Sequence, residues 1–319
     1  MASSGPLELP KQTASNVAWL FPGQGAQEVG MGRDLWESSP AGREVLKAAD
    51  RVLGFSLTQV CFDGPEEKLR DTRITQPAIM AVSLAALAAA LEAGAITARP
   101  AFVAGHSLGE YSALVAAGAL SLEEGLRLIE VRARLMAEAG EANPGTLAAI
   151  MGMREEDVEA VCREAGADVC NLNLPDQTVV GGTREAVQRA LALAKERGAR
   201  RALELNVSGA FHSRLMRPAV EGLEEAVRRA EIGPPAVPVM SNVAAVPLRT
   251  ADDVRAELPR QIISPVRWHQ SVVNMSAAGV TAFVEFGPGK VLTGLVRRLA
   301  PDATLANVST YADAGQLKM

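Results

Sequence analysis

The sequence predicts an α/β protein in which a small subdomain interrupts a larger domain. Two short apolar runs, residues 16–21 and 101–104, each end in a glycine-containing turn, the pattern of buried strands that lead into tight turns. From about residue 145 the pattern changes to strand, helix, strand, strand, helix, strand. That order is typical of a ferredoxin-like unit, so this stretch is expected to be an insert.

The larger domain is expected to comprise residues 15–143 and 207–310, and the insert residues 144–206. Residues 1–14 are expected to be a flexible tail and residues 311–319 a second tail. Helical periodicity in the larger domain is found at residues 32–53, 78–93, 107–117, 121–140, 213–230 and 251–262. Ser121 to Glu124 has the pattern of a capping box at the start of the fourth of these helices. A further strand is predicted near residues 237–241, and a helix and a strand within 269–286.

Composition and charge narrow the possible functions. The 319-residue chain is 48% apolar and 22% charged, as in ordinary soluble α/β proteins. Its net charge of −5 argues against a nucleic-acid partner, because surfaces that bind phosphate backbones are usually basic. The cysteines, Cys61, Cys162 and Cys170, show no C-x-x-C spacing. Neither a disulfide framework nor a metal site is therefore predicted.

The segment that most resembles a membrane span is residues 79–98. It is dominated by alanine and interrupted by Ser83 and Glu92, so a buried helix is the better interpretation. The first 14 residues lack the apolar segment of a signal peptide. We therefore expect a cytoplasmic protein with no membrane partner.

A candidate nucleophile lies between the second predicted strand and the helix that follows it. Gly105-His106-Ser107-Leu108-Gly109 fits the G-x-S-x-G pattern of a nucleophile elbow. The serine of such an elbow lies on a strained turn at a helix N-terminus, where free N–H groups favour a developing negative charge. The five-residue pattern alone also fits a glycine-rich turn, but the flanking strand and helix favour the elbow.

An oxyanion hole needs two convergent N–H donors. The amide of Leu108, directly after the serine, is the expected first donor. The second should come from the end of another strand. The turn from Pro22 to Gly25 is the best candidate because its glycines let the backbone approach closely, and we choose the amide of Gln24.

The serine also needs a base, and the chain has only three histidines. The side chain of His106 is expected to diverge from the hydroxyl of the adjacent Ser107, and His269 has no distinctive local pattern. His212 lies at a predicted junction between a strand and a helix, a common position for catalytic residues. We therefore favour His212, although a lone histidine is often structural.

One arginine lies on the apolar face of a predicted helix. On a helical wheel of residues 122–138, Arg132 falls between Leu128 and Met136, inside the apolar arc. An inward guanidinium is costly unless it is paired. Arg132 therefore forms an internal salt bridge, reaches out at the edge of the core, or faces a cleft that receives an anion. For a carboxylate, the planar fork of arginine offers two parallel hydrogen bonds.

Together these residues resemble the malonyl-CoA:acyl-carrier-protein transacylases and the related acyltransferase domains of polyketide synthases. The matching motifs lie in the family's order over about residues 16–300, nearly the whole chain. They are Phe21-Pro-Gly-Gln-Gly-Ala-Gln27, Thr75-Gln-Pro-Ala78, Gly105-His-Ser-Leu-Gly-Glu-Tyr-Ser112, Val131-Arg132, Asn171-Leu-Asn-Leu-Pro-Asp-Gln177, Gly209-Ala-Phe-His212, Ser241-Asn242, Ser264-Pro-Val266 and Glu285-Phe-Gly-Pro-Gly-Lys290.

The resemblance implies a fold and a set of roles. The larger domain should be α/β-hydrolase-like, with the ferredoxin-like subdomain inserted in it. The implied roles are Ser107 as nucleophile, His212 as base, the amides of Gln24 and Leu108 as oxyanion hole, Arg132 as carboxylate clamp, the main-chain carbonyl of Gln261 as the group that orients the histidine, and Gln76, His106 and Asn173 as lining of the cleft. Phe211, in Ala210-Phe211-His212, resembles malonyl-selective members. Two departures, Ala26 for a common serine and Ala133 for a common glycine, remove no reacting group.

The implied reaction is ping-pong transfer of malonyl from malonyl-CoA, through an acyl-serine, to the phosphopantetheine thiol of an acyl carrier protein in fatty acid biosynthesis. No cofactor is implied, and we expect a monomer. The basic cluster Lys195, Arg197, Arg200 and Arg201 is a candidate docking surface for the carrier protein, or simply a solvated helix end. The alternatives are a stand-alone polyketide acyltransferase, a serine thioesterase and a catalytically silent scaffold that binds carrier proteins.

Overall fold

The computed structural model describes residues 5–12 and 16–317, so the tail predicted for residues 1–14 lies partly outside the described residues. A six-stranded sheet, in the order β10-β9-β1-β2-β7-β8, forms the centre of the larger domain. The strands from β10 to β7 pair in parallel, whereas β8 pairs antiparallel to β7. They are β1 (Val17–Phe21), β2 (Phe102–Gly105), β7 (Val239–Met240), β8 (Pro247–Leu248), β9 (Ala282–Phe286) and β10 (Thr304–Val308).

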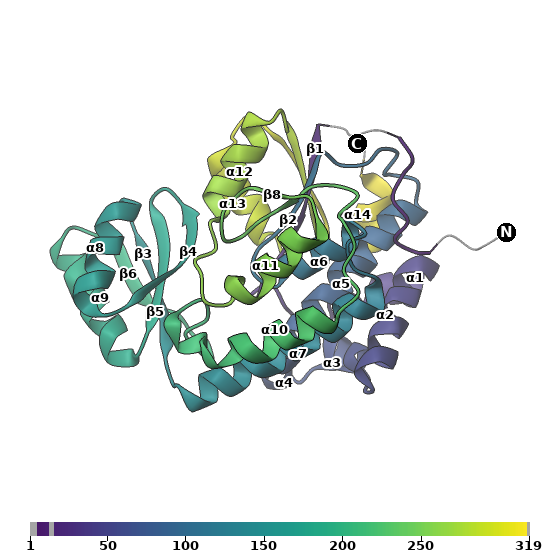
Figure 1. Ribbon diagram of the computed structural model, residues 1–319. Coiled ribbons are helices and arrows are strands. Elements are labelled where there is room, and N and C mark those ends of the chain that lie inside the picture. The colour runs from purple at the N-terminus through teal and green to yellow at the C-terminus, as the bar shows by residue number, and fades with distance from the viewer. Residues whose placement is uncertain (1–4, 13–15, 318–319) are drawn as a thin grey trace.

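Helices cover both faces of this sheet (Figure 1). Alternate side chains of the central strand β1 point to opposite faces, as the pleat of a strand requires. Trp19 and Phe21 belong to the larger hydrophobic cluster, whereas Ala18 and Leu20 pack with residues of α12 and α13. Because β1 is buried on both faces, all five of its residues are apolar.

The helices of the larger domain fall on either side of the insert in the sequence. Before it come α1 (Arg33–Ser38), α2 (Pro40–Leu53), α3 (Leu57–Asp63), α4 (Glu66–Arg70), α5 (Thr72–Glu92), α6 (Gly109–Ala116) and α7 (Leu122–Ala142). After it come the 3-10 turn η1 (Arg214–Met216), α10 (Pro218–Arg229), α11 (Ala251–Gln261), α12 (Trp268–Ala277), α13 (Val291–Leu299) and α14 (Tyr311–Gln316).

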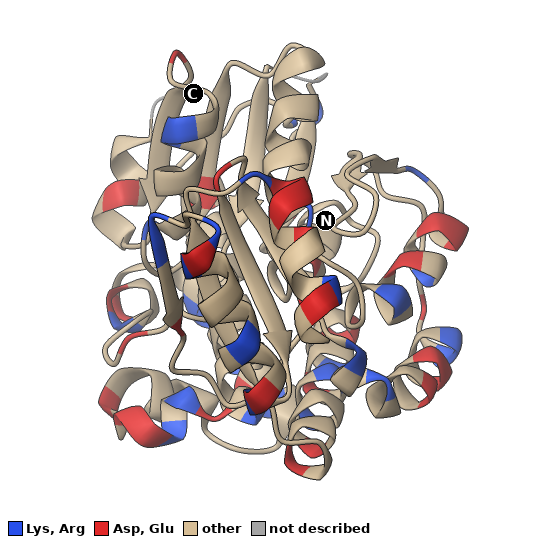
Figure 2. Cartoon of the chain, turned by 90° about the vertical axis from the view of Figure 1, so that its left-hand side faces the viewer, with Lys and Arg blue, Asp and Glu red and all other residues tan. Residues whose placement is uncertain are grey.

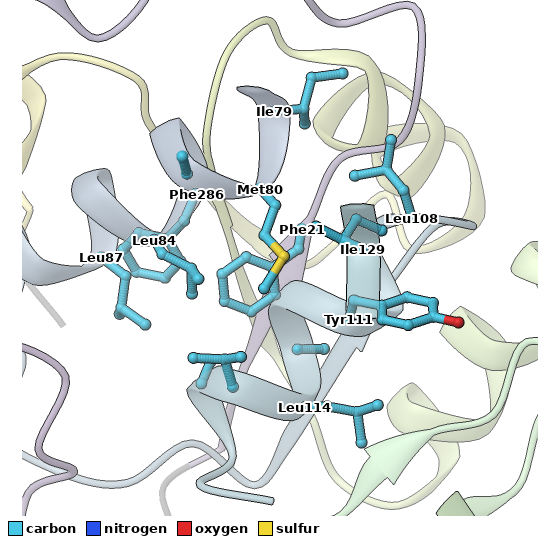
Figure 3. Packing of buried hydrophobic residues seen from close by; sticks show 14 of the residues in the cluster. Phe21, Ile79, Met80, Leu84, Leu87, Leu108, Tyr111, Leu114, Ile129 and Phe286 are labelled. Carbon is cyan, nitrogen blue, oxygen red and sulfur yellow. The ribbon is translucent and has the colours of Figure 1, made fainter. Parts of the chain in front are cut away.

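The alanine-rich helix α5 runs through the core of the larger domain. Its side chains Met80 and Leu84 lie near Phe21 of β1 and Phe286 of β9 (Figure 3). Among the described residues it is the one helix long and apolar enough to cross a membrane, and 89% of its apolar window is buried. The predicted buried helix is thus confirmed.

The insert contains a four-stranded antiparallel sheet in the order β4-β5-β3-β6. Its helices pack together over that sheet, on the side where Ile150 and Val180 are buried with Val158 and Val187. The elements are β3 (Thr146–Met151), α8 (Glu155–Ala165), β4 (Asp168–Leu174), β5 (Gln177–Gly182), α9 (Arg184–Glu196) and β6 (Arg201–Glu204). The predicted ferredoxin-like order is confirmed, and Figure 1 shows the insert standing to one side of the larger domain.

The structure differs from the prediction in several elements. The buried helix begins at Thr72 rather than at residue 78, because Asp71 caps it by accepting a hydrogen bond from the amide of Arg73. The helix predicted at residues 32–53 is two helices, divided at Ser39, whose side chain caps α2. The short elements α3, α4 and β10 were not predicted.

The expectation of a tail at residues 311–319 is wrong for residues 311–316, which form the helix α14. A capping box between Thr310 and Asp313 starts this helix. The amide of Tyr311 donates to the carboxylate of Asp34 at 2.7 Å, and Ala314 is buried. These contacts hold the segment against the larger domain, while residues 318 and 319 lie outside the described residues.

Candidate active site

The turn between β2 and α6 holds Ser107 in a strained conformation. Its φ of 54° lies in the left-handed region, which a residue with a side chain seldom adopts. A Cβ on Gly105 would lie 1.9 Å from the carbonyl of Gly109, and one on Gly109 would lie 2.1 Å from the carbonyl oxygen of Phe21. Both glycines are therefore required by the close approach of backbone to backbone, which is the geometry of a nucleophile elbow.

His212 lies within hydrogen-bonding distance of the serine. Its Nε2 is 2.7 Å from Ser107 Oγ, and its Nδ1 is 2.8 Å from the main-chain oxygen of Gln261. A carbonyl oxygen can only accept, so Nδ1 carries the proton and Nε2 is free to accept one from the serine hydroxyl. Ser107, His212 and the carbonyl of Gln261 therefore form a hydrogen-bonded chain like a catalytic triad, in which the carbonyl takes the place of an acidic third member.

The environment of His212 keeps its imidazole neutral. Its side chain is buried, and desolvation, with a smaller contribution from the positive charge of Arg132, lowers the pKa of His212 to about 3. A neutral imidazole is the form that can act as a base. At neutral pH the histidine is therefore ready to accept the Ser107 proton.

Arg132 lies deep in the same site with only 1% of its surface exposed. It donates to Gln76 Oε1 at 2.5 Å, to Gln261 Oε1 at 2.8 Å and to Ser107 Oγ at 3.0 Å. All of these acceptors are uncharged, and Nε of Arg132 has no hydrogen-bond partner among the described residues. Burial lowers the pKa of Arg132 from its ordinary value. A buried guanidinium without a carboxylate partner is a site prepared for an anion.

A cavity of about 570 Å³ opens over Ser107 between the larger domain and the insert. The turn after β1 closes tightly on the elbow, because a Cβ on Gly23 would lie 2.7 Å from the carbonyl oxygen of His106. Gln24 and Leu108 both line the cavity, and neither amide has an acceptor among the described residues. The insert contributes Leu147, Asn171, Asn173 and Val179 to the lining.

The remaining predicted residues also meet in this cavity. His106 turns toward the insert, with Nε2 2.9 Å from Asn173 Oδ1, and burial lowers its pKa. Gln76 lies beside Arg132, and Phe211 lines the wall next to His212. His269 does not line the cavity; its Nδ1 lies 3.3 Å from the carbonyl oxygen of Leu172.

Sequence reasoning assigned no role to two residues at this site. Asn242 Oδ1 accepts from the amide of Ser107 at 2.8 Å, and Glu110, in the first turn of α6, accepts from Asn242. Glu110 is the one charged residue in an otherwise uncharged helix, so the argument that singled out Arg132 could have found it. The described residues contain no cluster of three or more side chains able to hold a metal ion.

The model of the acyl transferase domain family matches residues 18–318 of the chain. The chain belongs to the acyl transferase domain family. A malonyl CoA-acyl carrier protein transacylase of Bacillus subtilis is 45% identical over 290 residues, which cover 89% of this chain and 90% of that protein. The resemblance found in the motifs is thereby confirmed over the full length of the domain.

Solved structures of acyl transferases share this fold. An acyl-carrier-protein S-malonyltransferase from Bartonella henselae matches with a TM-score of 0.91 and 38% identity, covering 94% of this chain and 97% of its own. A malonyl-transacylase in complex with its type II polyketide synthase acyl-carrier protein matches with a TM-score of 0.91 and 39% identity, covering 95% and 99%. The predicted fold class, a larger α/β-hydrolase-like domain with a ferredoxin-like insert, is confirmed.

Proposed function

We propose that the protein transfers the malonyl group of malonyl-CoA to the phosphopantetheine thiol of an acyl carrier protein, through a malonyl ester on Ser107, in fatty acid biosynthesis. The observation that carries the proposal is the buried guanidinium of Arg132 beside Ser107 Oγ, which gives the nucleophile a neighbour suited to a carboxylate. The names of the Bacillus subtilis and Bartonella henselae relatives, a malonyl CoA-acyl carrier protein transacylase and an acyl-carrier-protein S-malonyltransferase, support the same substrates.

In the first half-reaction His212 Nε2 takes the proton of Ser107 as Oγ attacks the thioester carbonyl. The negative charge that develops on the carbonyl oxygen is held by the amides of Gln24 and Leu108. The carbon–sulfur bond then breaks, and the departing CoA thiolate receives the proton from His212. Malonyl remains as an ester on Ser107.

The second half-reaction reverses these steps with another thiol. The phosphopantetheine thiol of the carrier protein gives its proton to His212 and attacks the ester carbonyl. The tetrahedral intermediate collapses, the carbon–oxygen bond breaks, and Ser107 recovers its proton from His212. The carbonyl of Gln261 holds the imidazole in one tautomer throughout, so the same nitrogen serves both halves.

Arg132 supplies the choice of acyl group in this proposal. The malonyl carboxylate would receive the two parallel hydrogen bonds that a guanidinium offers. An acetyl group has no carboxylate and would leave the buried charge as it is in the free enzyme, so its transfer gains nothing from Arg132. Gln76, His106, Asn173 and Phe211 bound the space in which the acyl group lies. We place the reaction in the cytoplasm.

The direct test is acylation with radiolabelled malonyl-CoA. Wild-type protein should carry the label after denaturation, and Ser107→Ala should carry none, because the substitution removes the attacking oxygen. The matched control is Ser112→Ala, at a buried serine of α6 that lies five residues after Ser107 and does not line the cavity. Label that survives Ser107→Ala would contradict the assignment of the nucleophile.

The fate of the label distinguishes the competing activities. With a carrier protein present, malonyl should move to its phosphopantetheine thiol faster than free malonate appears. Faster release of malonate would identify a thioesterase, and no acylation at all would identify a scaffold.

A further inference from the structure

Glu110 is a fully buried carboxyl group that takes no part in the steps above. It lies in the first turn of α6, three residues after Ser107. Its Oε1 accepts hydrogen bonds from the main-chain amide of Asn242 at 2.8 Å and from Asn242 Nδ2 at 3.1 Å. Its Oε2 accepts from Gln261 Nε2 at 2.6 Å. Both oxygens are therefore acceptors for N–H groups.

The two partners of Glu110 are the residues that hold the reacting groups. Asn242 accepts from the amide of Ser107 through Oδ1 and donates to the carbonyl of Gly105 at 2.7 Å through Nδ2. Gln261 donates to the carbonyl of Ser107 at 2.9 Å through Nε2, and its own main-chain oxygen faces His212. Glu110 is thus connected to Ser107 through Asn242 and Gln261, and to His212 through Gln261.

The burial of Glu110 is costly. Desolvation, and next the neighbouring carboxyl of Glu257, raise the pKa of Glu110 well above its ordinary value. Burial also raises the pKa of Glu257, whose Oε1 accepts from the amide of Val243 at 2.9 Å. Two carboxyl groups buried side by side are poor stabilisers of a core. A role in the geometry of the site is a better reason for this arrangement than stability.

We propose that Glu110 is a positioning residue, which fixes Asn242 and Gln261 and through them holds the strained backbone of Ser107 and the carbonyl that orients His212. This inference rests on one part of the proposed function, namely that Ser107 and His212 are the reacting pair. The left-handed φ of Ser107 has to be maintained against its own strain, and the bonds to its amide and its carbonyl do so.

An amide cannot replace this carboxyl group. Glutamine has one oxygen and one NH2 group. If its oxygen faced the donors of Asn242, its NH2 would face Gln261 Nε2, and the reverse orientation would oppose the amide of Asn242. In either orientation donors face each other, so Glu110→Gln has the right shape and the wrong hydrogen bonds.

Glu110→Gln should therefore lower kcat while leaving the KM for malonyl-CoA within about twofold, because Arg132 keeps its bonds to Gln76 and Ser107 even where Gln261 is displaced, and the cavity wall is unchanged. Loss of the alignment between Ser107 and His212 by about 1 Å corresponds to roughly a 100-fold decrease in rate. The rate of inactivation by a phosphonofluoridate, which reports the reactivity of Ser107 without any acyl donor, should fall by the same factor. This readout keeps its meaning even if malonyl transfer is not the reaction.

The matched control is Glu285→Gln. Glu285 is also buried and accepts from the amides of Leu292 and Thr293 and from Thr293 Oγ1, at the start of α13. Its substitution should lower the Tm without changing the inactivation rate of the folded protein. An inactivation rate in Glu110→Gln that matches the control would overturn the proposal and leave Glu110 a structural residue.

If Glu110→Gln does not fold, Asn242→Ala tests the positioning role of Glu110. It removes the side chain that joins Glu110 to the amide of Ser107, so inactivation should slow and the KM for malonyl-CoA should stay within about twofold. An unchanged inactivation rate in this variant would overturn the proposal. If both variants fold, the double variant should lose less than the product of the single losses, because the residues act in one chain of contacts.

Discussion

His212 and Arg132 both lie beside the hydroxyl of Ser107, and the positive charge of Arg132 disfavours the protonated form of His212. The positive charge of Arg132 adds to burial in lowering the pKa of His212 to about 3, while an unfolded histidine has a pKa of about 6.5. Below pH 6.5 the unfolded chain takes up a proton at this position that the native protein refuses. The contribution of His212 to stability is therefore complete above pH 6.5 and decreases as the pH falls toward 3.

This coupling predicts a titration. The imidazole resonances are few, since the chain has three histidines. By NMR, His212 should stay neutral until the pH approaches 3, and Arg132→Ala should raise its pKa because a nearby positive charge is removed. Arg134→Ala, at an exposed residue of α7 paired with Glu138, should leave it unchanged. A wild-type midpoint near 6.5, or no shift in Arg132→Ala, would refute this account.

At the scale of elements, the turn that carries Ser107 lies where the backbones of β1, β2 and α6 are in close contact. The carbonyl of Phe21 at the end of β1 lies so close to Gly109 of α6 that no side chain fits between them, and Gly105 of β2 fits against Gly109 in the same way. The position of Ser107 therefore depends on how β1, β2 and α6 pack together.

Gly109→Ala tests this dependence. The added methyl group must displace β1 or α6, which should destabilise the fold by about 1–3 kcal/mol and abolish most acylation of Ser107. Gly118→Ala is the control: it ends the same helix with a φ of +71° and open space around it. That substitution should cost about 1–2 kcal/mol through backbone strain and leave the acylation rate unchanged. Thermal unfolding and malonyl labelling measure the two effects.

Some of these elements could be predicted from the sequence, and others could not. The elbow, the insert and the inward position of Arg132 follow from local patterns of glycine and apolar residues. The helix α14 has a local capping box, but its place against the larger domain depends on Asp34 far away in the chain, and β10 is an edge strand with few buried residues. The role of Glu110 depends on partners 132 and 151 residues away, which no local pattern reports.

At the scale of the whole molecule, the cavity is built from both domains, so a carrier protein has to approach where they meet. The predicted docking cluster lies on the insert and does not line the cavity. Within it, Arg197 pairs with Glu164 and Arg200 pairs with Asp176, which also pairs with Arg298 of α13. Figure 2, seen from the side of the insert, shows basic and acidic residues interspersed. The docking role remains a prediction.

Charge reversal tests it. Arg197→Glu combined with Arg201→Glu should raise the KM for an acidic carrier protein by roughly fivefold, the equivalent of about 1 kcal/mol, with no change for free pantetheine. Arg163→Glu, at an exposed position of α8 on the same insert, is the control. Equal effects on both acceptors, or the same effect in the control, would show that the carrier protein docks elsewhere.

The central position of β1 has a consequence for the order in which the protein can form. The strand pairs on one side with β2, which follows about 80 residues later, and on the other with β9, which is synthesised about 260 residues after it. Until β9 leaves the ribosome, Trp19 and Phe21 lack Phe286, the ring they contact across the sheet. A nascent chain that already contains Ser107, His212 and Arg132 therefore still lacks one of the two strands that pair with β1, until β9 has been synthesised.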